Sequence, residues 1–475
     1  MQTNIYAITD SHQESRNLSR LLSGIYNLEK SSAAPFLVLD AGDLFKGIYD
    51  KELSVNAYIK LKQLLPQAQI FLTLGNNDFG FTKADFEYLK HTIKVFESAG
   101  INFVCANLID SVSWVDEYKI IEINGQKILI TGFCLNNSCT KKFKCDLMPP
   151  EQSFENLIKS IQADYDKIIV LNHHWYTYSK SLKDFALSRG VDIDLIIGGH
   201  EHSKIVPNFE DNIFYPLSFA RSMYKMTMGE TISNIEEISL EQTTFIPEFE
   251  TPILEYEQKT GLKQPIARRV LNLTKCYSEP CPLGTFISDS MKNVGKTDIA
   301  FHSTGFTMYP LRLSDSNTVT KYDLERVMCP TTSAIEKIKI SVEQLKQVFE
   351  NAAKFRMLKD RGNSRFLQCS RNIKITGKGN PKDKTYTIVQ IEIDGELLLD
   401  ENAKPINPAR IFTCTIDDFI GKGEQGFDVL KSIPKTEVLK NGTPVLLSEL
   451  FYNSVIEAEN LYQTSVYPVF GFIDL

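Results

Sequence analysis

The sequence predicts an α/β protein built from more than one domain. In the first half, short apolar runs alternate with segments of helical periodicity, as in an open sheet covered by helices. A length of 475 residues exceeds what one hydrophobic core normally supports. Over residues 241–262 the chain becomes rich in Glu, Gln and Lys, and a different rhythm follows. We therefore expect a first domain over residues 1–245, a linker helix over residues 246–263 and a second domain over residues 264–475.

The first domain is expected to repeat a unit of strand, turn and helix. Pro35 opens an apolar run that ends at Gly42 and Asp43, which is typical of a buried strand followed by a sharp turn. The dipeptide Asn124-Gly125 between two apolar runs is a strong hairpin signal. The strands expected here cover residues 5–9, 36–39, 68–74, 102–105, 118–123, 126–131, 167–171 and 194–197, and the helices cover residues 16–28 and 54–65.

The second domain has a different order of helices and strands. We expect helices over residues 284–292 and 342–354, and strands over residues 334–340, 385–393 and 410–415. The sequence shows no internal repeat and no low-complexity tract.

Composition and charge narrow the classes of partner. The chain is 43% hydrophobic and 23% charged, which is ordinary for a globular protein, and its net charge is −7. This charge argues against a nucleic acid duplex or an anionic membrane as partner, and no apolar run has the length of a membrane span. The N-terminus lacks the regions of a signal peptide, and the nine Cys show no Cys-x-x-Cys spacing. We expect a cytoplasmic protein, or a periplasmic or extracellular one if a leader was removed, and leave its oligomeric state open.

Side chains that bind metals stand at the ends of five predicted strands. They are Asp10 and His12, then Asp43, Asn76, His173 with His174, and His200 with His202. Open α/β sheets keep their chemistry at these carboxyl ends. A single Asp there most often caps the next helix, and a single His is most often a hydrogen-bonded residue, as we expect for His91 and His302. Five sites with one pattern instead indicate a metal centre, and imidazole with carboxylate suits Zn, Mn, Fe, Co or Ni.

Five short motifs, in this order, resemble the calcineurin-like metallophosphoesterases: Asp-x-His, Gly-Asp, Gly-Asn-x-Asp, a downstream His, and Gly-His-x-His. In the second half, C-P-L-G-T-F-I-S-D-S-M, R-F-L-Q-C-S and D-D-F-I-G-K-G-E-Q-G-F are similar to the C-terminal domain of the 5′-nucleotidase and UDP-sugar hydrolase family. The resemblance covers nearly the whole chain. It implies an N-terminal α/β/β/α sandwich, a C-terminal α+β substrate-binding domain and a hinge in the linker.

The resemblance also implies a role for each motif residue. It assigns Asp10, His12 and His202 to a first divalent ion, Asp43 to a bridge, and Asn76, His173 and His200 to a second ion. His174 stays outside this set. The implied reaction is in-line attack on phosphorus by a metal-bridging hydroxide, with two cations lowering the pKa of the attacking water. The implied substrate is a small phosphoester, a nucleotide above all.

The chain departs from this family at the catalytic motif. Asn77 stands where the family carries a His that contacts the phosphoryl group and assists the leaving oxygen. An amide donates a hydrogen bond but cannot transfer a proton at neutral pH, so catalysis should weaken while metal binding does not. Asp78 is the usual acidic neighbour and could still orient the site. Asn77 and Asp78 are therefore the catalytic candidates.

The substrate pocket departs further. Thr307 stands where the family carries a substrate-binding Arg, and a second Arg of the family has no counterpart in Tyr277-Ser278-Glu279. Three arginines nearby in sequence are candidates to replace them: Arg312, Arg365 and Arg371. Phe366 and Phe427 match the two aromatic residues that stack on a nucleobase, and the alternative is that both are core residues of a β-rich domain.

Two classes of function follow from these observations. The first is a metal-dependent phosphoester hydrolase that acts on nucleotides or related phosphate esters, like a 5′-nucleotidase, and the complete ligand set favours it. The second is a catalytically weakened member that binds metals and a ligand, which Asn77 and the missing arginines favour. Within the enzyme class, a phosphodiesterase for cyclic nucleotides or nucleotide sugars is a further alternative.

Overall fold

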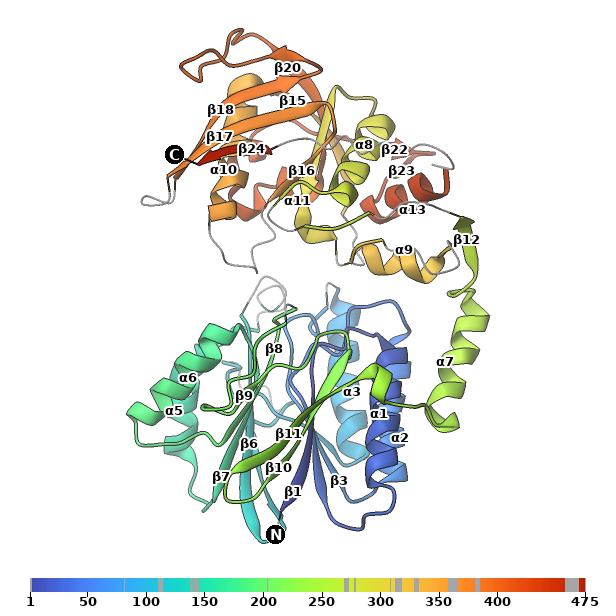
Figure 1. The fold of residues 1–475 in the computed structure, drawn as a ribbon, viewed down its shortest axis with the longest axis vertical. Helices are drawn as coiled ribbons and strands as arrows, with labels where there is room; N and C mark the ends of the chain where they lie inside the picture. Colours follow the sequence, from blue (N-terminus) through green and yellow to red (C-terminus); the bar gives the residue numbers. More distant parts are fainter. Residues whose placement is uncertain are drawn as a thin grey trace. The chain divides into compact units, whose positions relative to one another are not determined.

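The computed structural model describes residues 2–80, 82–109, 114–136, 140, 145–202, 204–268, 273–276, 279–307, 309–311, 318–328, 333–357, 366–380, 385–457 and 470–474. The chain forms two compact units, Met1–Lys259 and Thr260–Leu475 (Figure 1). The division falls inside the segment 246–263, where we expect the linker helix, and the finer domain limits stay a prediction. No helix in the described ranges is both long and apolar enough to cross a membrane.

The first unit contains two mixed sheets. Their strand orders are β11-β10-β1-β2-β3-β4 and β5-β6-β7-β8-β9. Strands β1 to β4 run parallel, as do β6 to β9, so the carboxyl ends within each set lie at one edge. The strands are β1 (Thr3–Ile8), β2 (Phe36–Asp40), β3 (Ala68–Leu72), β4 (Ile101–Phe103), β10 (Ser222–Met228), β11 (Ile232–Ser239), β5 (Tyr118–Ile123), β6 (Gln126–Cys134), β7 (Lys167–His173), β8 (Leu195–Gly199) and β9 (Ile213–Phe214).

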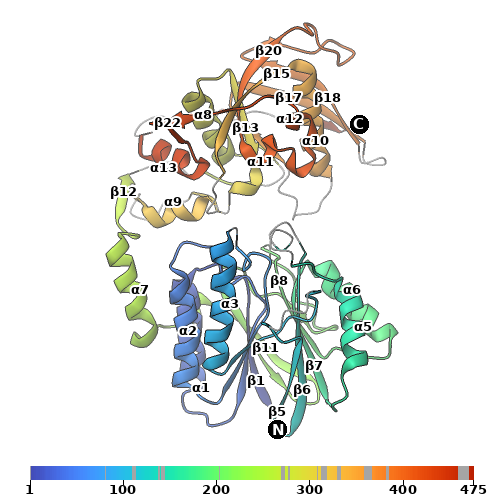
Figure 2. The same ribbon diagram turned by 180° about the vertical axis from the view of Figure 1, so that it is seen from behind.

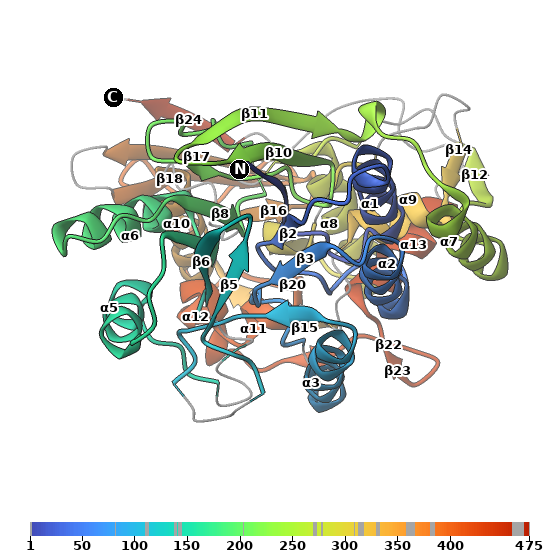
Figure 3. The same cartoon turned by 90° about the horizontal axis from the view of Figure 1, so that it is seen from below.

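Helices cover the outer faces of the two sheets. The first sheet carries α1 (Ser15–Glu29), α2 (Lys51–Leu64) and α3 (Lys83–Ser98), and the second carries α5 (Pro150–Ser160) and α6 (Tyr176–Ser188) (Figures 1 and 2). Seen from below, these two helix layers lie on opposite sides of the unit (Figure 3). The α/β/β/α sandwich that the resemblance implies is thus confirmed.

The first sheet is buried on both of its faces. Along β1, Tyr6 and Ile8 pack in the core under the helices, whereas Ile5 and Ala7 pack in the core between the sheets. Successive side chains of a strand point to opposite faces, so a strand covered on both sides needs apolar residues at every position. This requirement explains why the strands that carry the candidate ligands are unbroken apolar runs in the sequence.

The second unit has the α+β organisation that we expect. Its larger sheets have the orders β16-β13-β20-β15-β21 and β19-β18-β17-β24. Helix α8 (Pro282–Gly295) packs on the first of these sheets, and α10 (Val342–Met357) packs on β18. The strands are β13 (Ile299–Ser303), β15 (Ile335–Ser341), β16 (Leu367–Cys369), β17 (Ile373–Asn380), β18 (Thr385–Ile393), β19 (Glu396–Leu397), β20 (Ile411–Asp417), β21 (Thr436–Glu437) and β24 (Phe470–Asp474). Further elements are β12 (Pro265–Arg268), β14 (Thr318–Thr320), α9 (Lys321–Val327), α11 (Asp418–Gly421), α12 (Asp428–Lys431), β22 (Leu439–Lys440), β23 (Thr443–Pro444) and α13 (Leu447–Glu457).

Helix α7 (Pro247–Thr260) lies in the segment where we expect the linker helix. Its residues Phe249 and Ile253 are buried. Glu257 accepts two hydrogen bonds from the Arg16 guanidinium, at 2.8 and 2.6 Å, and a third from the Tyr49 hydroxyl at 2.5 Å. A buried carboxylate with an arginine fork is a geometrically specific contact, so α7 is held on the first unit as far as Glu257.

Candidate metal centre

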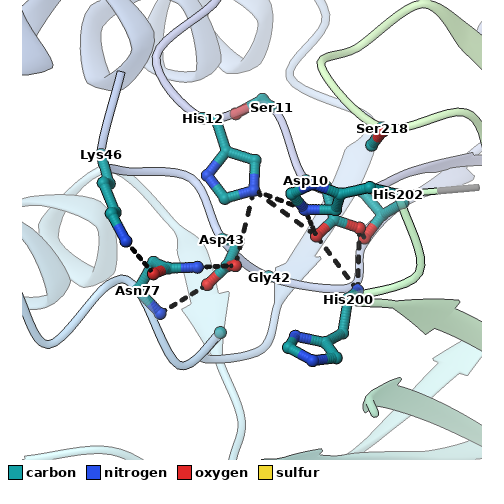
Figure 4. A network of polar contacts seen from close by, with 12 residues as sticks. Asp10, Ser11, His12, Gly42, Asp43, Lys46, Asn77, His200, His202 and Ser218 are labelled. Atoms are coloured by element: carbon teal, nitrogen blue, oxygen red, sulfur yellow. Dashed lines mark hydrogen bonds and ion pairs between the residues drawn. The ribbon is translucent and has the colours of Figure 1, made fainter. Parts of the chain in front are cut away.

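The candidate ligands lie at the carboxyl ends of five strands from both sheets. Figure 4 shows Asp10, His12, Asp43, His200 and His202. Asp10 and His12 follow β1, Asp43 follows β2 and Asn76 follows β3. His173 is the last residue of β7. His200 and His202 follow β8. The structure brings these residues, apart from Asn76, together in two groups that share Asp43.

The first group contains Asp10, His12, Asp43 and His202, with one ligand atom of each within 4.8 Å of the others. The Nε2 atoms of His12 and His202 lie 3.0 Å apart. His12 Nε2 is 3.7 Å from Asp10 Oδ1 and 3.5 Å from Asp43 Oδ2. His202 Nε2 is 3.5 Å from Asp10 Oδ1. Two imidazoles and two carboxylates that converge in this way are a ligand set for a divalent transition metal.

The second group contains Asp43, His173 and His200, again with ligand atoms within 4.8 Å of one another. His173 Nε2 lies 3.2 Å from the same Asp43 Oδ2 that faces His12. Among the described residues, His173 Nε2 and Asn76 Oδ1 are buried and have no hydrogen-bond partner. Buried polar atoms without partners are rare and need an explanation, and a bound cation supplies one. The residues present therefore fit a metal.

Hydrogen bonds on the far side of the imidazoles fix which nitrogen faces each group. His173 Nδ1 lies 2.8 Å from the Ala41 carbonyl oxygen, and His12 Nδ1 lies 3.3 Å from that of Phe45. A carbonyl oxygen only accepts, so Nδ1 carries a proton in both rings and Nε2 is the nitrogen that faces the cluster. The turn after β2 thus orients two histidines besides supplying Asp43.

The ligands stand on turns of unusual backbone conformation. Asp10, His12, Asp43 and His200 have φ values of 47°, 46°, 59° and 75°. A side chain other than glycine in this region costs about 1 kcal/mol, and such residues gather at functional sites. Gly75 shows how closely the turns meet, because a Cβ at this position would lie 2.1 Å from Asp43 Oδ1.

The Asp78 carboxylate connects the turn after β2 to the turn after β3. Its carboxylate accepts hydrogen bonds from the backbone N–H groups of Asp43 at 3.0 Å, Phe45 at 2.9 Å and Gly75 at 2.7 Å. Burial and the charge of Asp43 raise the pKa of Asp78 to about 7, although the backbone N–H groups oppose this rise. Asp78 therefore holds the backbone of the turn that carries Asp43, and its catalytic role stays a prediction.

Asn77 lies between the shared carboxylate and a lysine that the sequence analysis missed. Its backbone N–H donates to Asp43 Oδ1 at 2.7 Å, and its side-chain amide donates to Asp43 Oδ2 at 2.5 Å. Lys46 Nζ donates to Asn77 Oδ1 at 2.8 Å (Figure 4). Lys46 stands three residues after Asp43, but no sequence motif marks its contact with Asn77, which is 31 residues away.

The carboxylates and imidazoles of the cluster shift one another's pKa values. Burial alone would raise the pKa of Asp43, but the nearby His173 and His12 hold it well below its usual range. Burial likewise opposes the charge on His173, yet Asp43 raises the pKa of His173 to about 10. His200 behaves differently, because burial and His173 lower its pKa to about 3. Two buried carboxylates, Asp10 and Asp43, therefore create a field that favours cations.

Aromatic residues that the sequence analysis missed line the two groups. The Phe219 ring packs on His12 at 5.2 Å and on His202 at 5.0 Å between ring centroids, and its N–H donates to the Asp10 carbonyl at 2.5 Å. Trp175 packs edge-on against His200 at 4.1 Å. No sequence motif marks Phe219, since its contact with the first ligands joins segments far apart in the chain.

Neither ligand group contains His174, His302 or Arg371. His174 is buried and its ring packs on Tyr178, which agrees with leaving it out of the ligand set. In the second unit, His302 is buried and its Nδ1 lies 3.0 Å from the Ser288 hydroxyl. Arg371 pairs with Asp289 at 2.6 Å. Arg312 and Arg365 lie outside the described residues.

The two expected base-stacking residues are part of the interior of the second unit. Phe366 is 1% exposed and Phe427 is 0% exposed, and Phe427 belongs to the main core of that unit. Thr307 is also buried and its hydroxyl donates to the Thr304 carbonyl at 3.0 Å. A nucleobase between the two phenyl rings would require these side chains to become exposed, so this role stays a prediction.

Comparison with protein families agrees with the geometry in both units. Residues 3–204 match the model of the calcineurin-like phosphoesterases, and residues 259–432 match the model of the 5′-nucleotidase C-terminal domain. The fold and the site together define a metallophosphoesterase. The chain belongs to the 5′-nucleotidase family, in which a calcineurin-like phosphoesterase domain is followed by a 5′-nucleotidase C-terminal domain.

Curated relatives and solved structures are similar to all or part of the chain. An apyrase of Tabanus yao is 23% identical over an alignment of 495 positions, which covers 92% of this chain and 86% of the relative. A trifunctional nucleotide phosphoesterase of Bacillus subtilis is 25% identical, over 41% of this chain and 15% of its own length. A 5′-nucleotidase precursor from Thermus thermophilus shares the fold with a TM-score of 0.74 and 17% identity, covering 100% of this chain and 99% of its own. A sulfate thiohydrolase from Thermus thermophilus has a TM-score of 0.67 and 13% identity, covering 97% and 82%.

Proposed function

We propose that this phosphoester hydrolase acts on nucleotides or related small phosphate esters with two divalent ions. The observation that carries the proposal is the position of Asp43 Oδ2, which lies 3.5 Å from His12 Nε2 and 3.2 Å from His173 Nε2. One carboxylate oxygen that faces both ligand groups suits a pair of neighbouring cations. The ions named by the ligand chemistry are Zn, Mn, Fe, Co or Ni.

The chain offers each ion a defined set of side chains. Asp10, His12 and His202 would hold one ion, Asn76, His173 and His200 would hold the other, and Asp43 would contact both. Divalent cations at such a site activate a water, clamp phosphoryl oxygens and neutralise charge on the leaving oxygen. The second ion would have fewer charged ligands than the first. Asn76 Oδ1 is buried without a hydrogen-bond partner, which supports Asn76 as one of the ligands of this ion.

The other residues of the site orient these ligands and restrict which leaving groups the substrate can have. The carbonyl oxygens of Ala41 and Phe45 set the histidine tautomers, and Asp78 fixes the turn that carries Asp43. Asn77 can donate a hydrogen bond to a phosphoryl oxygen but cannot protonate a leaving group. We therefore expect substrates whose leaving group departs readily without a proton to be turned over best, since general acid catalysis contributes about 10²–10⁴ in rate for other substrates.

The relatives support a nucleotide as the substrate class. One is called an apyrase and another a nucleotide phosphoesterase, although their identities to this chain are 23% and 25%. A second candidate function is ligand binding with little turnover. The specific observation that favours it is the bonding of Asn77 to both Asp43 oxygens, where the family resemblance implies a proton donor.

Hydrolysis of a substrate panel separates these functions. The panel contains p-nitrophenyl phosphate, bis(p-nitrophenyl) phosphate, AMP, ADP, a 2′,3′-cyclic nucleotide and UDP-glucose, each with Mn²⁺, Co²⁺ or Zn²⁺. Metal-dependent turnover of the nucleotides supports the proposal, and preference for the diesters or for UDP-glucose indicates a phosphodiesterase. Two bound ions per chain without turnover of any substrate would favour the binding protein.

A further inference from the structure

Lys46 places an ammonium group in the hydrogen-bond network of the site. It lies three residues after Asp43, and its side chain is half-buried. Nζ donates to Asn77 Oδ1 at 2.8 Å, and the Asn77 amide in turn donates to Asp43 Oδ2 at 2.5 Å. Figure 4 shows the Lys46 side chain extended toward Asn77 beside Asp43. A cation thus stands one hydrogen-bonded residue away from the carboxylate shared by both ligand groups.

The backbone of Lys46 is held in place by the turn that carries His12. Gly47 approaches this turn so closely that a Cβ would lie 1.6 Å from the His12 carbonyl oxygen. The Gln13 side chain accepts from the Gly47 N–H at 2.8 Å and donates to the Tyr49 carbonyl at 2.5 Å. The position of the lysine is therefore fixed by the elements that fix the ligands.

Lys46 also has an unfavourable backbone conformation for its type. Its φ is 75°, a region that glycine enters freely and that costs other residues about 1 kcal/mol or more. Three of the five residues from Gly42 to Lys46 have a positive φ, namely Gly42, Asp43 and Lys46. A long cationic side chain at a strained position next to a candidate metal centre is typical of a functional residue rather than of a solvated loop.

The charge of Lys46 suits the anionic end of the substrate. A lysine ammonium has three N–H donors, and one of them is directed to Asn77. Donors from lysine to phosphate oxygens are charge-assisted and are stronger than neutral hydrogen bonds. The Lys46 ammonium therefore brings a positive charge to the end of the hydrogen-bonded chain that runs through Asn77 to the shared carboxylate.

We propose that Lys46 binds the non-bridging oxygens of the phosphoryl group and makes the site select dianionic phosphate monoesters over monoanionic diesters. This inference rests on the proposed function, because it names the charge of the substrate that this site takes. A lysine that only oriented Asn77 would affect both substrate classes alike. The difference between the two classes is therefore the property to measure.

The test compares four variants of the full-length, metal-loaded protein. Lys46→Met removes the charge and the donor, Lys46→Gln keeps a donor for Asn77 without the charge, and Lys46→Arg keeps the charge. Lys90→Met is the matched control, since Lys90 forms a surface ion pair with Glu87 on α3. Binding of inorganic phosphate is measured by isothermal titration calorimetry, and kcat/KM is measured for p-nitrophenyl phosphate and its bis-ester, which share a leaving group.

We expect phosphate to bind about 10-fold more weakly to Lys46→Met and to Lys46→Gln, and within about 3-fold of wild type to Lys46→Arg and Lys90→Met. The kcat/KM for the monoester should fall about 10-fold or more in both neutral variants, with less than about 3-fold change for the diester. Unchanged phosphate affinity in Lys46→Gln, or equal losses for both esters, would overturn the inference. Weaker phosphate binding by the neutral variants of a protein without turnover would keep the inference and reject the proposed function.

Discussion

Asn77 donates hydrogen bonds to both carboxylate oxygens of Asp43, from its backbone N–H to Oδ1 at 2.7 Å and from its side-chain amide to Oδ2 at 2.5 Å. The residue that stands where the resemblance implies a proton donor is thereby part of the support for the shared ligand. Its replacement should change the leaving-group dependence of the reaction more than the metal content. This difference leads to the first prediction.

Asn77→His should raise turnover of substrates with poor leaving groups by about 10-fold to 100-fold, because an imidazole can protonate the departing oxygen. Turnover of p-nitrophenyl phosphate should change by less than about 3-fold, since p-nitrophenolate leaves without a proton. The measurement is the ratio of kcat/KM for phenyl phosphate to that for p-nitrophenyl phosphate, with bound metal determined in parallel. An equal change for both esters would show that residue 77 does not limit leaving-group protonation.

Asp78→Ala should destabilise the first unit by about 2–5 kcal/mol, because three buried backbone N–H groups lose their acceptor. Metal affinity should fall about 10-fold to 100-fold, as for other residues that orient a ligand. Both Trp residues, Trp114 and Trp175, lie in this unit, so urea unfolding followed by Trp fluorescence reports on it.

The control for this prediction is Asp184→Ala. Asp184 is 57% exposed and pairs with Lys180 on the surface of α6, so the change should stay within about 0.5 kcal/mol. A stability loss in Asp78→Ala as small as in the control would contradict the role that the hydrogen bonds assign to Asp78.

Because of His302, the free energy of unfolding of the second unit should fall at acidic pH. Burial lowers the pKa of His302 to about 3, whereas an unfolded histidine titrates near pH 6.5. Between these values the unfolded chain binds a proton that the folded chain does not, so the free energy of unfolding falls as the pH drops below about 6.5. His302→Asn removes this dependence, and the stability gap to wild type should narrow by about 2 kcal/mol between pH 6.5 and pH 5.

Hydrogen exchange of the β13 and β20 amides measures this gap, because the chain has no Trp in the second unit. The amide of the variant can still donate to the Ser288 hydroxyl, which donates its own proton to the Gln368 carbonyl and lies 3.0 Å from His302 Nδ1 in the wild type. Parallel pH profiles for wild type and variant would mean that another group governs the acid sensitivity of this unit.

The sequence marks the candidate ligands because the end of a buried strand has a local signal, although their role as ligands stays a prediction. Residues such as Asp10 and Asp43 follow strands that are apolar on both faces, and a charged residue at that point has to end the run. The same local rule predicts the hairpin between β5 and β6, where Asn124 and Gly125 have φ values of 52° and 81°. Both features are set by neighbours in the chain.

Features that depend on distant segments were not predicted. Lys46 acquires its role from Asn77, and Phe219 acquires its role from His12, contacts that no local pattern encodes. Other omissions had a local signal. Helix α3 is absent from the sequence expectation, although Thr82 and Asp85 form a capping box at its N-terminus.

The base-stacking role could not be decided from the sequence for a physical reason. A phenylalanine that stacks on a ligand and one that fills a core have the same apolar character, so composition and periodicity do not separate them. Phe366 and Phe427 are buried here, which makes the core role the one that the structure displays.

The most direct test of the account is hydrolysis of p-nitrophenyl phosphate by protein stripped of metal with a chelator and then reloaded with Mn²⁺. Asp43→Asn is the comparison, since it keeps the shape of the shared ligand and removes its charge. The account predicts that chelation abolishes turnover, that Mn²⁺ restores it in the wild type, and that the variant stays at least about 10²-fold slower. Turnover that survives chelation, or that Asp43→Asn leaves unchanged, would contradict a phosphoesterase centred on Asp43.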